Sequence, residues 1–222
     1  MRLKIEVISL DIILCADKNG GISMAVNKDT VIRINLSEED LSKCTENAQI
    51  LCETISDRSD LHLRSYMERY INILMGEVAE AAVIKWLRQS GKYANSAVNK
   101  KSGKPDSGRD IILKDKYGQE IGCSVKSSLS AYKNSIDDIL DTFKVATKES
   151  ELRKVNIQVY YWLILNGVNR ISVPSDKNMA IIGWIGENDV EKFGTYRTEN
   201  RQVANIKLRD IRTMQSLLDY LK

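Results

Sequence analysis

Histidine and proline are nearly absent from this 222-residue chain, which contains one His and two Pro. Its four cysteines, Cys15, Cys44, Cys52 and Cys123, are scattered along the sequence, and none forms a CxxC pair. Structural zinc is usually held by Cys and His ligands in closely spaced pairs, so we do not expect a zinc site. A disulfide framework is not expected either, because the chain is long enough to build its own core. The lone histidine, His62, is interpreted as structural or simply exposed.

No apolar run approaches the length that is needed to span a bilayer. The first six residues, MRLKIE, alternate charged with apolar side chains, which is not the pattern of a signal peptide. An excess of one charge is also lacking, because 33 Lys and Arg face 30 Asp and Glu and the net charge is only +3. We therefore expect a soluble cytoplasmic protein without a membrane partner. A nucleic-acid-binding face would have to come from local clustering of cations.

Low-complexity tracts, internal repeats and clear linkers are missing as well, which indicates one core with elaborations. Residues 1–60 are predicted to form a β-meander followed by a helix. The strands are predicted at 5–15, 22–26 and 31–36, between turn-rich segments, and the helix begins at Ser37-Glu-Glu-Asp40, a capping-box composition. Residues 61–222 are predicted to form the functional core, in one compact unit with the N-terminal part.

Hydrophobic periodicity in the core predicts both helices and strands. A long helix at 61–90 ends at Gly91, which stands in the usual C-terminal position. The elements predicted after it are a polar loop at 92–109, a hairpin at 110–126, a helix at 135–152, strands at 156–166 and 180–185, and a helix at 208–221. The expected fold class is α/β, with a mixed β-sheet flanked by helices.

Two glutamates of the long helix, Glu77 and Glu80, lie on a face that is otherwise apolar. Burying an unpaired carboxylate costs several kcal/mol, so such a pair needs a cation beside it, either a metal ion or a lysine. The alternative is an amphipathic helix in which one glutamate marks the edge of the wet face. Gly76 and Ala79 favour burial, because small side chains let a helix lie close to a sheet.

The hairpin carries a second set of polar residues. Asp110 directly precedes the apolar run that opens its first strand. In the second strand, Ser124 and Lys126 share one face, opposite to that of Cys123 and Val125. Asp110, Ser124 and Lys126 are therefore expected to meet near one edge of the sheet, with a helix glutamate opposite. Carboxylates, waters and a substrate phosphate can hold Mg²⁺ there, and Lys126 can orient a water for attack on phosphorus. The alternative is that Lys126 is an ordinary edge lysine.

The segments that carry these groups together resemble the core of the PD-(D/E)xK nuclease superfamily. They are residues 76–80 (GEVAE), 86–91 (WLRQSG), 109–113 (RDIIL) and 123–128 (CSVKSS). That superfamily includes type II restriction endonucleases, archaeal Holliday-junction resolvases and related repair nucleases. Its pattern is a helix with a glutamate, an aspartate that opens a strand, and Glu-x-Lys on the next strand. The resemblance implies a restriction-endonuclease-like fold and Mg²⁺-dependent hydrolysis of DNA.

Matched residue by residue, the resemblance makes Glu80 the helix glutamate, Asp110 the strand aspartate and Lys126 the motif lysine. Glu80 and Asp110 would then be metal ligands. The literal Pro-Asp pair lies four residues before Asp110, and its Asp106 falls in a Gly/Ser loop. Asp110 is therefore preferred as the strand aspartate.

The main departure is Ser124, which occupies the Glu position of Glu-x-Lys. Some restriction enzymes that resemble this pattern have a serine there and recruit the missing carboxylate from a helix. The resemblance thus implies that Glu77 or Glu80 completes the metal site, while Ser124 hydrogen-bonds a water of the metal. If neither glutamate reaches the site, metal binding would be weak and the site inactive.

Cations near the hairpin suit contacts with DNA phosphates on either side of a scissile bond. Phosphate contacts position a duplex but do not read its sequence. Each cluster has the alternative of being a solvated face. The candidates are Lys100, Lys101, Lys104, Arg109, Lys114 and Lys116 beside the hairpin, and Arg197 and Arg201 in the C-terminal third.

The sequence is therefore interpreted as that of a metal-dependent endonuclease of double-stranded DNA, and first as a sequence-specific type II restriction endonuclease. Cleavage of both strands favours a homodimer, with residues 1–60 as a dimer contact or DNA clasp. One alternative is a junction or repair nuclease of the same fold, which would recognise DNA structure. The other is a non-catalytic module that binds nucleic acid or protein, an alternative that Ser124 favours.

Overall fold

The computed structural model describes residues 25–54, 64–98, 100, 109–147, 151–169, 173–192, 197–198, 201–202 and 205–222. The strand predicted at 5–15 and most of the one predicted at 22–26 lie outside the described residues. So do Lys101, Lys104 and Asp106 of the polar loop.

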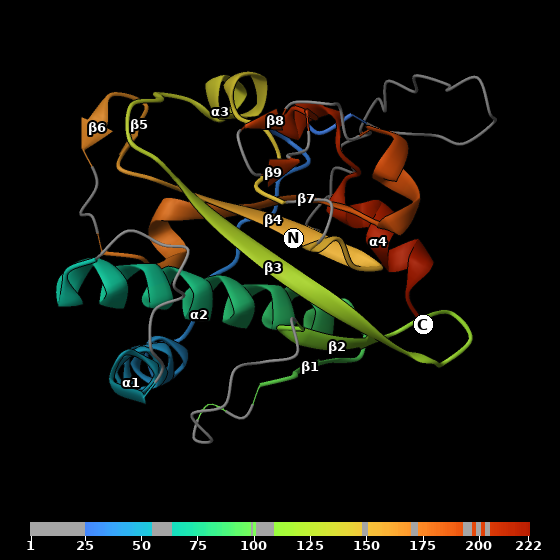
Figure 1. The fold of residues 1–222 in the computed structure, drawn as a ribbon, viewed down its shortest axis with the longest axis horizontal. Coiled ribbons are helices and arrows are strands. Elements are labelled where there is room, and N and C mark those ends of the chain that lie inside the picture. Colours follow the sequence, from blue (N-terminus) through green and yellow to red (C-terminus); the bar gives the residue numbers. More distant parts are fainter. Residues whose placement is uncertain are drawn as a thin grey trace, which may run out of the picture.

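A five-stranded mixed sheet forms the centre of the molecule (Figure 1). Its strands, in spatial order, are β1 (Ala94–Ser96), β2 (Ile111–Lys114), β3 (Glu120–Ser130), β4 (Val155–Trp162) and β7 (Met179–Ile185). β3 and β4 run parallel, and the other neighbours are antiparallel. β2 and β3 form the predicted hairpin, and Gly118 in its turn has a φ of 82°, a value that glycine adopts readily. The predicted α/β class is thus confirmed.

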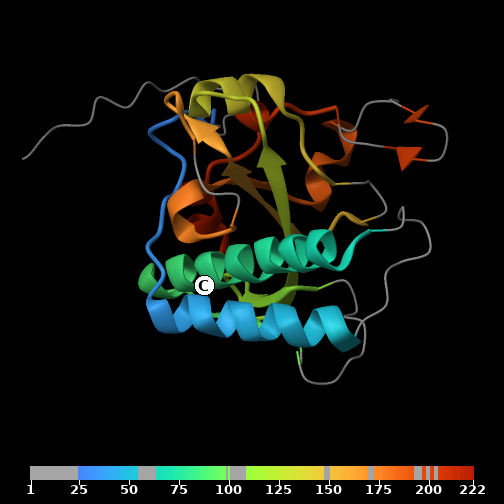
Figure 2. The same ribbon diagram turned by 90° about the vertical axis from the view of Figure 1, so that its left-hand side faces the viewer.

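Helices cover both faces of this sheet (Figure 2). They are α1 (Glu38–Thr54), α2 (Tyr66–Gln89), α3 (Ile136–Thr142) and α4 (Met214–Tyr220). α2 packs against one face with α1 beside it, whereas α3 lies across the sheet from them. No helix in the described part of the chain is long and apolar enough to cross a bilayer. The smaller elements are β5 (Ile164–Leu165), β6 (Val168–Asn169), β8 (Arg197–Thr198), β9 (Arg201–Gln202) and the 3₁₀ turns η2 (Asp176–Asn178), η3 (Glu187–Lys192) and η4 (Leu208–Asp210).

Side chains of the central strands alternate between two apolar layers. Cys123 of β3 and Tyr161 of β4 belong to the layer that α2 covers, and the Tyr161 hydroxyl donates to the Met75 carbonyl at 2.9 Å. Tyr160 and Trp162 belong to the layer that α3 covers. The position of a residue within its strand therefore decides which layer it joins.

The start of α1 follows the predicted capping box. The Ser37 hydroxyl accepts the Asp40 N–H at 3.1 Å, and Asp40 Oδ2 accepts the Ser37 N–H at 3.0 Å. Lys85 of α2 donates to the same carboxylate at 2.9 Å and so ties the two helices together. The Ser37 N–H first and Lys85 second lower the pKa of Asp40 to about 2.

The long predicted helix is α2. It begins after Ser65, whose hydroxyl accepts the Glu68 N–H at 3.2 Å, and it is followed by Gly91 with a φ of 75°. The prediction that Gly76 lets the helix lie close to the sheet is wrong, because a Cβ at that position would meet nothing within 4 Å. Ala79, in contrast, is fully buried. Close approach of α2 to the sheet depends on the second of these small residues and not on the first.

The strands predicted at 22–26 and 31–36 are not formed in the described residues. Ala25 makes only an isolated bridge to Arg212, and Ile32 only an isolated bridge to Ile181 of β7. The N–H of Leu36 donates to a carboxylate of η2 at 3.0 Å instead of to a neighbouring strand. The segment buries apolar side chains without a hydrogen-bonded ladder. Periodicity alone does not distinguish such an extended segment from a paired strand.

Three further boundaries differ from the prediction. The helix predicted at 135–152 ends at Thr142, because Phe143 is extended and the Val145 N–H pairs with the Ile206 carbonyl. The helix predicted at 208–221 is divided into η4 and α4. The polar loop at 92–109 contains β1, an Ala-Asn-Ser strand whose composition carries no apolar signal.

Candidate functional site

The two helix glutamates are both buried on the side of α2 that faces α1 and Lys100. Glu77 and Glu80 are each only 8% exposed. They lie three residues apart, so both side chains leave the helix on the same side. The structure therefore favours burial of the pair over the alternative in which one glutamate marks the edge of a wet face.

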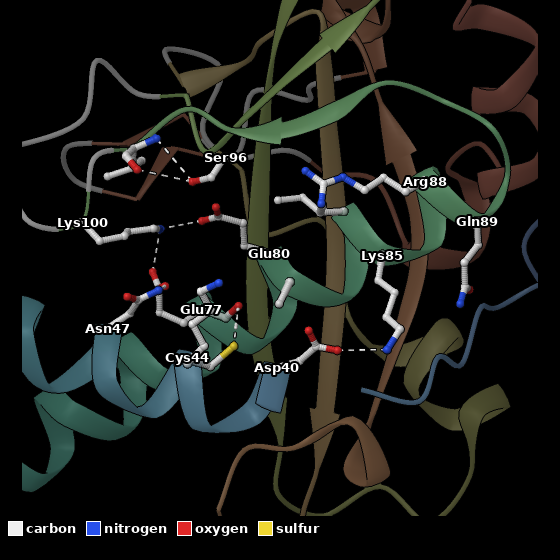
Figure 3. Close-up of a pocket in the computed structure, with 14 residues that line it drawn as sticks. Asp40, Cys44, Asn47, Glu77, Glu80, Lys85, Arg88, Gln89, Ser96 and Lys100 are labelled. Carbon is white, nitrogen blue, oxygen red and sulfur yellow. Dashed lines mark hydrogen bonds and ion pairs between the residues drawn. The ribbon is translucent and has the colours of Figure 1, made fainter. Parts of the chain in front are cut away.

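The cation that balances these carboxylates is a lysine. Lys100 Nζ lies 2.7 Å from Glu77 Oε1 and 2.8 Å from Glu80 Oε2 (Figure 3). The Lys100 side chain is 14% exposed, so its charge is largely withdrawn from solvent. Asn47 of α1 adds a hydrogen bond to Glu77 Oε2 at 3.0 Å. We call Glu77, Lys100 and Glu80 the ionic triple. Lys100, predicted to contact DNA, is thus paired with two carboxylates at the wall of a cavity.

The ionic triple contains two carboxylates and one ammonium and so carries an excess of negative charge. Burial raises the pKa of Glu80, although Lys100 and a hydrogen bond from Ser96 oppose this effect. Burial alone would lower the pKa of Lys100, but the two carboxylates outweigh it and the pKa is raised. Burial first and Glu77 second raise the pKa of the nearby Cys44 thiol to about 12. The electrostatic environment of the triple favours cations.

A cavity of about 680 Å³ opens beside the ionic triple. It lies between α1 and α2 and is bounded on a third side by the segment from Ser96 to Lys100 (Figure 3). Asp40 and Lys85 face each other at its other end, near Arg88. The carboxylates of the triple are therefore reached from an open cleft.

Asp110 lies at the edge of the sheet, immediately before β2. The pairing of Ile111 with Cys123 places it next to Ser124 of β3. Its Oδ2 accepts the Val125 N–H at 2.7 Å, and its carbonyl accepts the Ala97 N–H at 2.9 Å. The sequence placed Asp110 at the mouth of the first strand, and the structure places it there.

Ser124 and Lys126 point away from α2. Their partners in β4 are Asn156 and Gln158, which belong to the face covered by α3 and the segment after it. Ser124 is buried, and Lys126 is half-buried with its Nζ 3.3 Å from Glu151 Oε2. The sequence interpretation did not include Glu151, which lies in a segment that was predicted to be helical.

A buried polar network supports this second face. The Thr147 hydroxyl donates to Asn156 Oδ1 at 2.9 Å, and Gln158 Nε2 donates to both of these oxygens at 3.1 Å. Gln158 Oε1 accepts the Ala146 N–H at 3.1 Å. Asn156 and Gln158 are polar residues within a strand that was predicted to be continuously apolar. Their polarity was the signal in the sequence that could have indicated this network.

The helix glutamates and Lys126 are therefore separated by the sheet, and Asp110 lies at the edge between them. Burial first, then Asp110 and Glu80, raise the pKa of the Cys123 thiol. Within the described part of the chain, no three His, Cys, Asp or Glu side chains are grouped as metal ligands. Glu77 and Glu80 belong to α2, which packs on the face of the sheet opposite to Ser124.

Two of the expected DNA-contacting cations, Arg109 and Lys114, lie beside the hairpin. The side chain of Arg109 lies across Gly122, where a Cβ would come within 2.6 Å of Arg109 Cδ, so this glycine leaves room for it. Gly122 is on the same side of β3 as Ser124. Lys114 lies 4.5 Å from the centre of the Tyr93 ring. Arg197 and Arg201 lie in β8 and β9, but their side chains are outside the described part of the structure.

Comparison of the chain with protein-family models, with curated proteins and with solved structures finds no match. The functional interpretation therefore depends on the geometry of these residues and on the motif resemblance in the sequence.

Proposed function

We propose that the protein is a metal-dependent endonuclease that hydrolyses phosphodiester bonds of double-stranded DNA, as a sequence-specific type II restriction endonuclease of the PD-(D/E)xK class. The observation that carries the proposal is the arrangement around Asp110. This carboxylate lies beside Ser124 of the adjacent strand β3, and Ser124 stands two residues before Lys126.

The architecture supports the same proposal. The helix α2, which carries the glutamates, is followed in the chain by the antiparallel strands β1, β2 and β3. Asp110 stands immediately before β2, and Lys126 lies in the interior of β3. A helix and a strand parallel to β3 come next. This is a mixed sheet with helices on both faces, as expected for a restriction-endonuclease-like fold.

Glu80 and Asp110, with Glu77 in reserve, are the residues that would hold Mg²⁺. Their donor atoms are all carboxylate oxygens, which is the ligand type that this ion prefers. Bound magnesium supplies a Lewis acid for the phosphate and makes a coordinated water more acidic. For Glu80 to serve as a ligand, Lys100 has to release it, and Lys100 then remains paired with Glu77.

The remaining residues act on the phosphate and the attacking water. The ammonium of Lys126 can balance the charge on a phosphate oxygen and orient a water, while Glu151 holds that ammonium in place. The Ser124 hydroxyl is close enough in the strand to share hydrogen bonds with the same water. Arg109, lying over Gly122, offers a cation for a neighbouring phosphate.

A second candidate function is a non-catalytic module that binds nucleic acid. It is favoured by two observations, the serine at position 124 and the ion pairs that Lys100 makes with both helix glutamates. In that case the ionic triple is a structural element, and Asp110 has the structural role of accepting the Val125 N–H.

The test is incubation of the purified protein with plasmid DNA, phage DNA and a four-way junction, in Mg²⁺ or in EDTA. Discrete Mg²⁺-dependent fragments from the linear and plasmid substrates, lost in Glu80→Ala, are the expected result. Cleavage of the junction alone would replace the proposal with a structure-specific nuclease. Intact DNA in every condition, with a folded protein that still binds DNA, would establish the non-catalytic module.

Cleavage of both strands at a short site also leads us to propose a homodimer. Light scattering coupled to gel filtration is expected to give about twice the mass of the chain, 25.2 kDa.

A further inference from the structure

Lysine and tyrosine side chains gather where the turn between β2 and β3 meets residues 221–222, beside the label C in Figure 1. We call this the hairpin-end surface. Its members come from three separate stretches of the sequence and are Lys92, Tyr93, Lys114, Lys116, Tyr117 and Lys222.

Two cation–aromatic pairs organise the hairpin-end surface. Lys114 Nζ lies 4.5 Å from the centre of the Tyr93 ring, and Lys116 Nζ lies 5.1 Å from that of Tyr117. Tyr93 is 39% exposed and Tyr117 is 76% exposed, so the rings face solvent. Aromatic faces of this kind hold the lysine side chains close to the surface without neutralising their charge.

Backbone contacts fix the three stretches relative to one another. The Lys222 N–H donates to the Lys114 carbonyl at 3.1 Å, and Lys92 Nζ donates to the Leu221 carbonyl at 2.8 Å. Asp115 forms a bridge with Leu221. The hairpin-end surface is thus a built feature of the fold, because it sits on paired strands.

The two acids that neighbour these lysines in the sequence offset only part of their charge. Oδ1 of Asp115 accepts the N–H groups of Tyr117 and Gln119, each at 2.9 Å. Glu120 lies opposite Lys114 in the register of the hairpin. Four lysines against these two acids give the surface a positive charge.

The geometry points to the phosphate backbone of DNA as the partner, and we propose that the hairpin-end surface binds the duplex beside the cleavage site. Lysine ammonium and tyrosine hydroxyl groups are typical phosphate contacts. Along β2, Lys114 lies four residues from Asp110, or about 13 Å, which corresponds to about four nucleotides of axial rise in one DNA strand. This inference rests on the proposed function, because it takes Asp110 as the position of the scissile phosphate.

The experiment is fluorescence anisotropy of a labelled 20-base-pair duplex in EDTA, across a series of salt concentrations. In Lys114→Ala/Lys116→Ala we expect the Kd to rise about tenfold at 0.1 M salt. The slope of log K against log salt should become less negative by about 2, since each lost phosphate contact removes about 0.9. The matched control is Lys28→Ala/Lys133→Ala, which removes the same charge near the opposite end of β3, where Lys28 lines a cavity with Ser135.

Equal weakening in both double variants, or unchanged binding in Lys114→Ala/Lys116→Ala, would overturn the inference, as would a wild-type protein that does not bind the duplex. Melting temperatures of both variants check that they are folded. The assay contains no metal and requires no cleavage, so it is independent of catalysis. If Lys114→Ala/Lys116→Ala weakens binding but the wild-type protein never cleaves DNA, the surface is kept and the nuclease is rejected. If the wild-type protein cleaves DNA but this double variant binds the duplex normally, only the surface is rejected.

Discussion

Lys100 shows at the scale of a single residue what the sequence can and cannot reveal. The spacing of Glu77 and Glu80 on an apolar helix face indicates that a cation must lie beside them. The identity of that cation depends on a contact with a residue 20 positions beyond Glu80, in a polar loop. Nothing local in the sequence distinguishes Lys100 from its neighbours Lys101 and Lys104.

Replacing Lys100 with methionine is predicted to destabilise the protein by about 3 kcal/mol, because two buried carboxylates lose their counter-ion. The free energy of unfolding, from urea titration at pH 7, measures the loss. Lys43→Met, at an exposed lysine of the same cavity, is the control and should cost less than about 0.5 kcal/mol.

The same variant offers a test of the cause. Adding Glu80→Gln to Lys100→Met removes one of the two uncompensated charges and should restore part of the lost stability. Because the pKa of Lys100 is raised above 10.5, its contribution is present below that pH and disappears as pH rises through the raised pKa. A Lys100→Met loss equal to that of Lys43→Met would contradict the ionic triple as a buried unit.

At the scale of an element, α1 is the part that local sequence predicts best. Ser37 and Asp40 satisfy each other's backbone N–H groups, and this reciprocal cap depends only on their spacing. Asp40 also pairs with Lys85, which lies 45 positions away in the sequence, and the local sequence does not predict this contact.

Asp40→Asn is predicted to reduce the free energy of unfolding by about 0.5 to 1 kcal/mol at pH 7, a modest loss because the carboxylate is 40% exposed. The pKa of Asp40 is lowered from 3.8 to about 2, so its contribution is present above pH 3.8 and is lost as pH falls toward 2. Urea titrations at several pH values should show the difference between variant and wild type closing in that window. Glu39→Gln removes a charge from the same turn but leaves the cap intact, so a similar pH dependence there would contradict this cause.

Elements whose hydrogen bonds go to distant partners were the ones predicted poorly. β1 is an Ala-Asn-Ser segment that is a strand only because β2 lies beside it. The helix predicted at 135–152 stops at Thr142, since residues after it pair with the 206–208 region. Apolar content was read correctly in both the 31–36 and 156–166 segments, but only the second has neighbouring strands, and these pair with it only as far as Trp162.

At the scale of the whole molecule, the sheet divides the candidate site. Alternation along β3 correctly placed Ser124 and Lys126 on one face, and the motif correctly placed Asp110 at the strand opening. The role of a helix glutamate in place of the missing acid stays a prediction, and α2 lies on the face of the sheet opposite to Ser124. That relation depends on which side of the sheet the helix packs, and no local pattern specifies it.

Glu151 is the acid that the tertiary structure brings to Lys126. The sequence did not predict this pair, because Glu151 is distant from β3 in the chain and lies in a segment with helical periodicity. In the divided site, Asp110 lies at the edge of the sheet beside Ser124, on the same side as Lys126 and Glu151, whereas Glu80 lies on the side that α2 covers.

The most direct measurement is the single-turnover rate of Mg²⁺-dependent cleavage of a plasmid by Lys126→Ala, compared with wild type and with Lys133→Ala, a lysine three residues beyond β3. We predict a fall of about 100-fold or more in Lys126→Ala, as for loss of one preorganised electrostatic group, and a rate close to wild type in Lys133→Ala. A Lys126→Ala protein that cleaves within threefold of the wild-type rate would place the chemistry elsewhere in the chain and contradict the assignment of this site.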